Sequence, residues 1–123
     1  MTLNNDYFKI DNCMNEGEDT LFSITLLSDY CAYEGHFPGN PVSPGVCNIQ
    51  MIKECAEQLA GKSLFLGYIS RCKLSAVITP QTTPQLSLRM WLNETEGLYS
   101  VSALVGDGET IYIDFKGELT PVL

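Results

Sequence analysis

The residue best suited to proton transfer is His36, the only histidine among 123 residues. It lies in a loop rich in glycine and proline, and these residues favour backbone conformations that hold a side chain in one position. Because imidazole titrates near neutral pH, such a histidine can take up and return a proton during a reaction. The alternative is a histidine with only a structural role in the loop.

The residues after this loop predict a helix over about 44–60. Ser43 is typical of a helix N-cap, and Pro44 is typical of the first helical position. The first N–H groups of a helix, here those of Gly45 and Val46, lack partners within the helix and attract a carbonyl oxygen or an anion. A base that faces this helix N-terminus could therefore act on a carbonyl compound bound there.

The composition predicts one compact domain over residues 1–123, since 45% of the residues are hydrophobic and only 18% are charged. The net charge of −8 argues against broad binding to nucleic acid or to anionic membranes. The N-terminus is polar and no segment of about 18 apolar residues occurs, so neither a signal peptide nor a membrane span is expected.

The chain has five cysteines, an odd number, and none forms a Cys-x-x-Cys pair. This spacing does not favour a zinc site, so no metal or cofactor is predicted. Buried free thiols in a reducing compartment are the expected state of these cysteines, which predicts a cytoplasmic protein. For Cys47, early in the helix, a packing role is expected, with a stabilised thiolate as the alternative. The cysteines are Cys13, Cys31, Cys47, Cys55 and Cys72.

The helix carries an apolar face that predicts burial on most of its sides. Apolar residues recur near helical spacing and are expected in the core, and Met51 and Cys55 broaden their face. The recurring residues are Val46, Ile49, Ile52, Ala56, Leu59 and Ala60. Gly61 suits the left-handed conformation that commonly ends a helix.

The rest of the chain alternates apolar and polar residues, as strands do. Residues 6–10 predict a short strand or a short helix, and residues 15–19 predict a turn. Residues 63–78 predict one long strand, or two with a kink near Ser70. The remaining strands are expected over about 20–28, with Phe22, Ile24 and Leu26 on the core side, and over about 86–92, 99–105 and 111–116.

These elements predict an α+β fold, in which a curved antiparallel sheet of about five to six strands wraps one long central helix. Short turns join the later strands, which makes these strands antiparallel. A small curved sheet has exposed edges, so pairing of two copies through an edge strand is also expected.

Residues 35–46 resemble the hotdog-fold beta-hydroxyacyl-acyl-carrier-protein dehydratases of type II fatty-acid synthesis. They follow the family pattern of glycines and prolines around the histidine, and Ser43 stands where the family often has Met. The resemblance implies a hotdog dimer with two active sites at its interface, and an acyl chain that enters a tunnel on a phosphopantetheine arm. The stretch reads Gly-His-Phe-Pro-Gly-Asn-Pro-Val-Ser-Pro-Gly-Val.

The resemblance also implies roles for single residues. His36 matches the base that takes the alpha proton of a 3-hydroxyacyl thioester. The N–H group of Gly45 matches the donor that holds the thioester carbonyl, where negative charge develops. Phe37, Pro44 and Val46 are expected to line the substrate site.

One departure from the family concerns the acid that helps the hydroxyl leave as water. The family has a carboxylate fourteen residues after the histidine, on the helix of the other subunit, and this chain has Gln50 there. Glu54 follows four residues later, so the two side chains share a helix face. We expect Glu54 to act as the acid, while Gln50 orients the substrate, a water or Glu54. The alternative is that Glu54 is an ordinary surface acid.

The implied reaction is dehydration of a 3-hydroxyacyl group on an acyl carrier protein to the trans-2-enoyl product, in fatty-acid or polyene-type lipid biosynthesis. Arg71 and Lys73 share a strand face and are the expected docking residues for the acidic carrier. The alternatives are an acyl thioesterase that activates water with Glu54, and a non-catalytic protein that pairs with an active homologue. A homodimer or higher homo-oligomer is expected, with a heterodimer as a further possibility.

Overall fold

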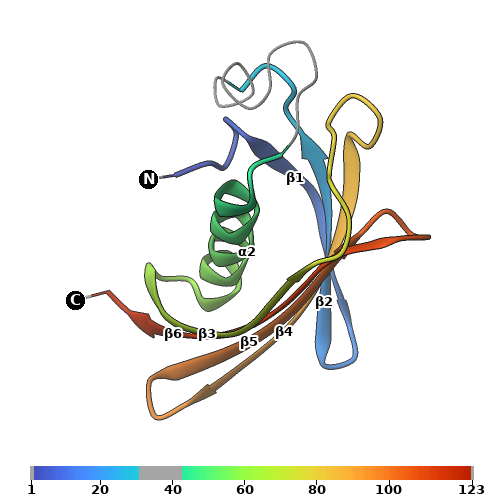
Figure 1. Cartoon of the computed structure of the whole chain (residues 1–123). Helices are drawn as coiled ribbons and strands as arrows, with labels where there is room; N and C mark the ends of the chain where they lie inside the picture. The colour runs from blue at the N-terminus through green and yellow to red at the C-terminus, as the bar shows by residue number, and fades with distance from the viewer. Residues whose placement is uncertain (1, 31–42, 123) are drawn as a thin grey trace.

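Six strands and one helix make up the part of the chain that the computed structural model describes, residues 2–30 and 43–122 (Figure 1). All neighbouring strands are antiparallel, and their order in the sheet is β1-β2-β4-β5-β6-β3. The elements are β1 (Phe8–Glu16), β2 (Asp19–Leu26), α2 (Gly45–Ala60), β3 (Leu64–Leu74), β4 (Gln85–Thr95), β5 (Leu98–Gly106) and β6 (Ile111–Pro121).

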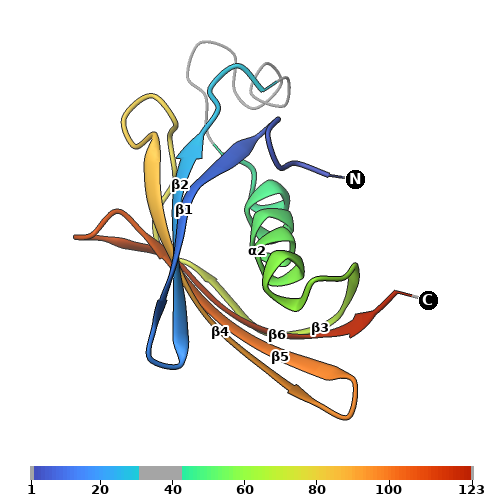
Figure 2. The same cartoon turned by 180° about the vertical axis from the view of Figure 1, so that it is seen from behind.

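Helix α2 lies against the concave side of this curved sheet, as the two opposite views show (Figures 1 and 2). The sheet stays open, with β1 and β3 as its two edges. This arrangement confirms the predicted α+β hotdog architecture and the upper end of the predicted number of strands.

The core forms because strand residues alternate between the helix side and the outer side of the sheet. On β2, Phe22, Ile24 and Leu26 are buried, while the residues between them are half-buried, which confirms the predicted core side. On the neighbouring β4, Leu88 and Met90 are fully buried. The alternating residues thus supply an apolar floor for the helix.

Helix α2 buries most of the face that the spacing predicts, since Ile52 and Ala56 are in the core and Ile49 packs against it half-buried. The placement of Val46 in the core is wrong, since its side chain is 70% exposed. The buried residues of the helix are Cys47, Asn48, Met51, Ile52, Cys55 and Ala56.

The start of α2 also differs from the prediction by one residue. The N-cap is Pro44, which has an extended backbone with φ −64° and ψ 139°, and not Ser43. The N–H group of Ser43 donates to the carbonyl oxygen of Ile78 at 2.8 Å, which ties Ser43 to the chain after β3 instead of to the helix. The predicted end is confirmed, since Gly61 has a φ of 72°. No helix in the described ranges is long and apolar enough to cross a membrane.

The strand bounds refine two further predictions. Of the two alternatives for residues 6–10 the strand is correct, and β1 continues to Glu16 because its polar residues pair with β2 in a tight hairpin. The predicted turn is therefore shorter and covers residues 17–18. The run predicted over residues 63–78 is one strand, but it ends earlier, at Leu74. Its pairing with β6 shifts register between Leu66 and Tyr68 and again between Ile69 and Arg71, where a kink near Ser70 is predicted.

The edge strand β3 exposes several large apolar side chains. Within the described part of the chain its only neighbour is β6, so its other side carries unpaired backbone groups. Exposed apolar residues continue beyond the strand at Val77, which is 65% exposed. On β3 itself they are Phe65, Tyr68, Ile69 and Leu74, with exposed fractions between 40% and 61%.

Gly117 allows β3 to approach β6 closely. A Cβ atom at this position would lie 2.8 Å from the carbonyl oxygen of Tyr68 and 3.1 Å from the Phe115 ring. We expect Gly117→Ala to lower the free energy of unfolding by about 1–3 kcal/mol, because the backbone of β3 must move. Urea unfolding measures this change, with Gly67→Ala as the control, since a Cβ there meets nothing closer than 3.6 Å. Equal stability of the two variants would contradict the prediction.

Candidate functional site

A hollow of about 240 Å³ lies at the N-terminus of α2, where the sequence predicts a carbonyl-binding site. One wall is the first turn of the helix, and the opposite wall is the chain that leaves β3. Most of the lining is apolar, with a few polar groups at the helix end. The lining residues are Ser43, Gly45, Asn48, Leu74, Ser75, Ala76, Val77, Ile78 and Ile113.

The backbone at the helix start presents N–H groups at this hollow. The first intrahelical hydrogen bonds run from the N–H groups of Cys47 and Asn48 to the carbonyl oxygen of Pro44, at 3.1 and 3.2 Å. The N–H groups of Gly45 and Val46 precede these bonds, and Gly45 lines the hollow. The positive end of the helix dipole adds to their attraction for a developing oxyanion.

The wall opposite the helix is held by backbone hydrogen bonds. Ser75 donates its N–H to the carbonyl oxygen of Tyr112 at 2.8 Å, which fixes the chain just after β3. The bond from Ser43 to Ile78 closes the same wall next to the helix start. Backbone hydrogen bonds thus hold this wall of the hollow in place, and Leu74, Val77 and Ile78 provide its apolar surface.

Asn48 is a buried polar residue of the hollow that the sequence predictions leave out. It is 4% exposed, and its side-chain oxygen accepts a hydrogen bond of 2.5 Å from the hydroxyl of Tyr7. Tyr7 is fully buried, and its ring packs edge-on against Tyr30 at 5.6 Å between ring centroids. One feature of the sequence could have indicated Asn48: it is a polar residue among apolar residues of the helix, and it lies on the same face as Gly45.

Gln50 and Glu54 lie together on α2, as their spacing predicts. The Gln50 amide nitrogen donates to Glu54 Oε2 at 3.0 Å. The same carboxylate accepts the backbone N–H groups of Leu3 at 2.7 Å and of Asn4 at 2.8 Å. Glu54 is half-buried, so its carboxylate anchors the N-terminal segment of the chain as well as the Gln50 side chain.

The remaining predicted site residues are placed as follows. His36 and Phe37 lie outside the described residues. Pro44 is the N-cap of α2, and Val46 is exposed in its first turn. The docking candidates Arg71 and Lys73 lie on β3, where Arg71 forms an ion pair of 3.6 Å with Asp114. Neither of the two lines the hollow at the helix end.

The cysteines of the described residues show no sign of nucleophilic or metal chemistry. Cys47 and Cys55 are buried free thiols in α2, and Cys13 is an exposed one. Burial raises the pKa of the Cys55 thiol, so this thiol stays protonated and acts as an apolar packing group. Residues 2–30 and 43–122 contain no cluster of side chains that could hold a metal ion.

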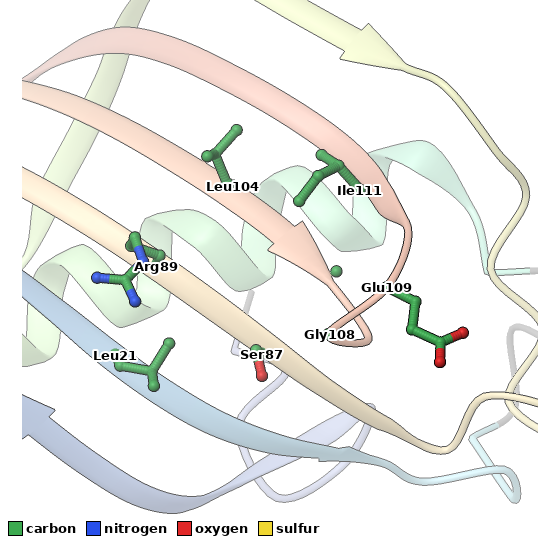
Figure 3. Close-up of a pocket in the computed structure, with 8 residues that line it drawn as sticks. Leu21, Ser87, Arg89, Leu104, Gly108, Glu109 and Ile111 are labelled. Atoms are coloured by element: carbon green, nitrogen blue, oxygen red, sulfur yellow. The ribbon is translucent and has the colours of Figure 1, made fainter.

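A second hollow, of about 270 Å³, lies on the outer face of the sheet, away from α2 (Figure 3). Leu21, Leu104 and Ile111 border it, and the side chain of Arg89 stands among them (Figure 3). Arg89 is paired with Glu16 at 2.7 Å and with Asp19 at 3.4 Å. This groove lacks the helix N-terminus that makes the first hollow suited to carbonyl chemistry.

Comparison with known families and sequences identifies relatives over most of the chain. A family model for ApeI-like proteins, described as ApeI dehydratase, matches residues 12–110. A 3-hydroxyacyl-acyl-carrier-protein dehydratase FabZ of Lactiplantibacillus plantarum is 32% identical over 102 residues, which cover 76% of this chain and 69% of that protein. The FabZ of Pediococcus pentosaceus is 35% identical over 93 residues, which cover 69% and 61%. The matches thus span about six to seven tenths of these relatives.

A solved structure confirms the fold. The chain superposes on the dehydratase heterocomplex ApeI:P from Xenorhabdus doucetiae with a TM-score of 0.70 and 18% sequence identity. The superposition covers 90% of this chain and 96% of that one.

Proposed function

The chain belongs to the ApeI-like dehydratase family, and from this membership we propose that it removes water from a 3-hydroxyacyl group bound as a thioester to an acyl carrier protein. The product is the trans-2-enoyl thioester, in fatty-acid or polyene-type lipid biosynthesis. The observation that carries the proposal is the hollow at the N-terminus of α2, which is lined by Gly45 of the histidine-containing motif. The free thiols of Cys13, Cys47 and Cys55 support a cytoplasmic location.

In the proposed reaction His36 takes the alpha proton of the bound thioester. The electron pair of the broken C–H bond moves towards the carbonyl oxygen, which the N–H group of Gly45 and the helix N-terminus stabilise. The pair then forms the carbon–carbon double bond as the C–O bond to the 3-hydroxyl breaks. The hydroxyl takes up a proton and leaves as water. Pro44, Val46 and Phe37 border the acyl group in this scheme.

In this proposal Glu54 gives the proton for the leaving hydroxyl from its protonated form and becomes a carboxylate, while Gln50 orients its side chain. The hydrogen bond of 3.0 Å from Gln50 to Glu54 supports this pairing. Glu54 also has a structural role. Its two carboxylate oxygens accept hydrogen bonds from the N–H groups of Leu3 and Asn4 and so hold the N-terminal segment. An experiment on Glu54 must separate proton donation from anchoring of the N-terminal segment.

We expect Glu54→Gln to lower the turnover number on the order of 10²-fold or more, because an amide cannot supply the proton. Mass spectrometry of a 3-hydroxyacyl carrier protein measures the loss of water. The matched variant Asn4→Pro removes one N–H donor to Glu54 and leaves the carboxylate in place. It should lower stability by about 1–3 kcal/mol, as loss of a hydrogen bond to a charged group does, with turnover kept.

Two further variants complete this comparison. Asn4→Ala retains the N–H group and serves as the control for Asn4→Pro. Gln50→Glu in the Glu54→Gln protein places a carboxylate where the family has it, and should restore part of the activity. If Glu54→Gln and Asn4→Pro have the same turnover, Glu54 is an anchor only and the acid assignment fails.

The edge strand β3 is the proposed surface for a second copy of the chain. Its outer backbone groups are unpaired within the described residues, and its apolar side chains are exposed. Pairing of two β3 strands about a twofold axis would satisfy the backbone groups and bury residues such as Phe65 and Ile69. The family resemblance implies two active sites at the dimer interface, which fits this proposal.

The proposed docking site for the acidic carrier contains Arg71 and Lys73. Lys73 stands opposite Asp114 in the β3–β6 register, and Arg71 is 52% exposed in its side chain and paired with the same aspartate. An acidic carrier could replace Asp114 as the partner of Arg71. Titration of the carrier with Lys73→Glu tests this assignment, and unchanged affinity would refute it.

Gln50 favours a second candidate function, that of a non-catalytic partner. In this case the chain binds the acyl carrier and pairs through β3 with an active homologue, which supplies the acid. The homomeric protein would then be inactive, and activity would appear on mixing with the homologue. Activity of the homomeric protein alone would exclude this candidate.

A further inference from the structure

Asn48 stands beside the helix N-terminus but has no role in the reaction described so far. It lies three residues after Gly45, so the two share one face of α2, and both line the hollow. At 4% exposure it is the most deeply buried polar side chain of that lining. A polar group in such a position costs stability unless it has hydrogen-bond partners, so the partners of Asn48 need to be identified.

The hydrogen bond with Tyr7 fixes which end of the Asn48 amide faces the hollow. Tyr7 donates its hydroxyl hydrogen to the side-chain oxygen of Asn48 at 2.5 Å. The amide nitrogen, with its two N–H donors, must point to another side. In residues 2–30 and 43–122, every fully buried side-chain nitrogen has a hydrogen-bond partner. The amide nitrogen of Asn48 has no acceptor among those residues, so it is not fully buried. The nitrogen of Asn48 therefore opens onto the hollow.

Tyr7 is itself held in a single position. Its ring is fully buried and packs edge-on against Tyr30, at 5.6 Å, and against Phe8, at 6.5 Å between ring centroids. A fixed hydroxyl fixes the amide plane of Asn48, so the N–H donors are oriented before any ligand arrives. Donors that are held in place before the reaction stabilise a developing negative charge more strongly than donors that must first reorient.

We propose that Asn48 donates a hydrogen bond to the thioester carbonyl oxygen, together with the N–H group of Gly45, and that Tyr7 is a positioning residue for Asn48. This inference rests on the proposed function, because it concerns the same carbonyl group. As the alpha proton leaves, the electron pair of the C–H bond places negative charge on that oxygen. Asn48 stabilises the charge until the pair forms the double bond and the hydroxyl departs as water.

The apolar wall of the hollow fits the same ligand. Leu74, Val77 and Ile78 face the helix end from the opposite side, where an acyl group would pass the two donors. The hollow therefore combines a polar end, formed by Gly45 and Asn48, with an apolar side. A thioester of a fatty acyl group has this distribution of polar and apolar atoms.

The first test measures binding and does not depend on turnover. The ligand is an acyl-pantetheine analogue in which an amide replaces the thioester, so the carbonyl group remains and no reaction follows. By isothermal titration we expect Asn48→Asp to bind on the order of 10- to 100-fold more weakly, because an oxygen replaces the N–H donors. Asn93→Asp, the same change at an exposed position on β4, is the matched control and should bind as the unmodified protein does.

The second test measures turnover of a 3-hydroxyacyl-pantetheine. We expect Asn48→Asp to lower kcat on the order of 10²–10³-fold, the usual effect of losing one donor to an oxyanion. Tyr7→Phe should lower kcat less and leave KM unchanged, since the donor is present but no longer held in place. If Asn48→Asp fails to fold, the double variant Tyr7→Phe with Asn48→Leu removes the donor and leaves no unpaired hydroxyl.

The two tests separate the failure of the inference from that of the proposed function. If both donor-free variants bind the analogue as tightly as Asn93→Asp does, the role of Asn48 is overturned, whatever the turnover. If the unmodified protein releases no water from any 3-hydroxyacyl chain, the proposed function fails in the homomeric protein. The binding test still decides in that case whether Asn48 holds the carbonyl oxygen.

Discussion

His36→Ala is expected to lower the rate of dehydration on the order of 10²–10⁴-fold, which is the usual contribution of a positioned general base. The chain has no other histidine that could substitute for it. Mass spectrometry of a 3-hydroxyacyl carrier protein follows the loss of water, and it also detects free carrier thiol, the product of a thioesterase. A variant with the unmodified rate would mean that His36 only supports its loop.

The control for this variant is its stability. His36→Ala should unfold at the same urea concentration as the unmodified protein, because the fold is held by the core between the sheet and α2. It should also bind the unreactive amide analogue with unchanged affinity, since the donors of Gly45 and Asn48 remain. Lost binding together with lost activity would instead assign His36 to substrate binding.

The second large effect is expected at the proposed interface, for Ile69→Lys. Ile69 is 40% exposed on the edge strand, opposite Gly117 of β6. A twofold interface contains the substitution twice, and a central apolar residue contributes about 2 kcal/mol or more. Two such losses weaken dimerisation on the order of 10³-fold. Analytical ultracentrifugation over a range of protein concentrations measures this change, and turnover should fall with the dimer.

The matched control for the interface is Leu104→Lys. Leu104 is 38% exposed, nearly the same as Ile69, but it lies on β5, which β6 separates from β3, and it borders the outer groove of the sheet (Figure 3). It adds the same charge without touching the proposed interface, so the dimer should persist. If Ile69→Lys stays dimeric, or if Leu104→Lys dissociates, the second copy does not pair through β3.

The sequence is sufficient to predict the elements of the fold, because each depends on nearby residues. The alternation on β2 and the glycine that ends α2 are local signals, and the structure has both where the sequence predicts them. The face of α2 that is buried is not a local property. It depends on the side from which the sheet covers the helix, and this is why Val46 is exposed and Asn48 is buried.

The contacts of the candidate site were also beyond the reach of local patterns. Tyr7 and Asn48 are 41 residues apart, and Leu3 and Glu54 are 51 residues apart. The hydrogen bonds to Glu54 come from backbone N–H groups, which every residue except proline has, so no pattern of side chains predicts them. The spacing of Gln50 and Glu54, in contrast, lies within one helical turn and predicts their contact. The role of His36 stays a prediction from its motif.

The position of β3 at the edge of the sheet also determines the order in which the chain can fold. β4, β5 and β6 are consecutive and are joined by short turns, so their contacts close small loops. Strand β3 precedes all three in the chain, yet its neighbour in the described sheet is β6, so their pairing closes a much longer loop. We therefore expect β3 to join the sheet later than the β5–β6 hairpin forms, so that the edge proposed to receive a second copy is completed late in folding.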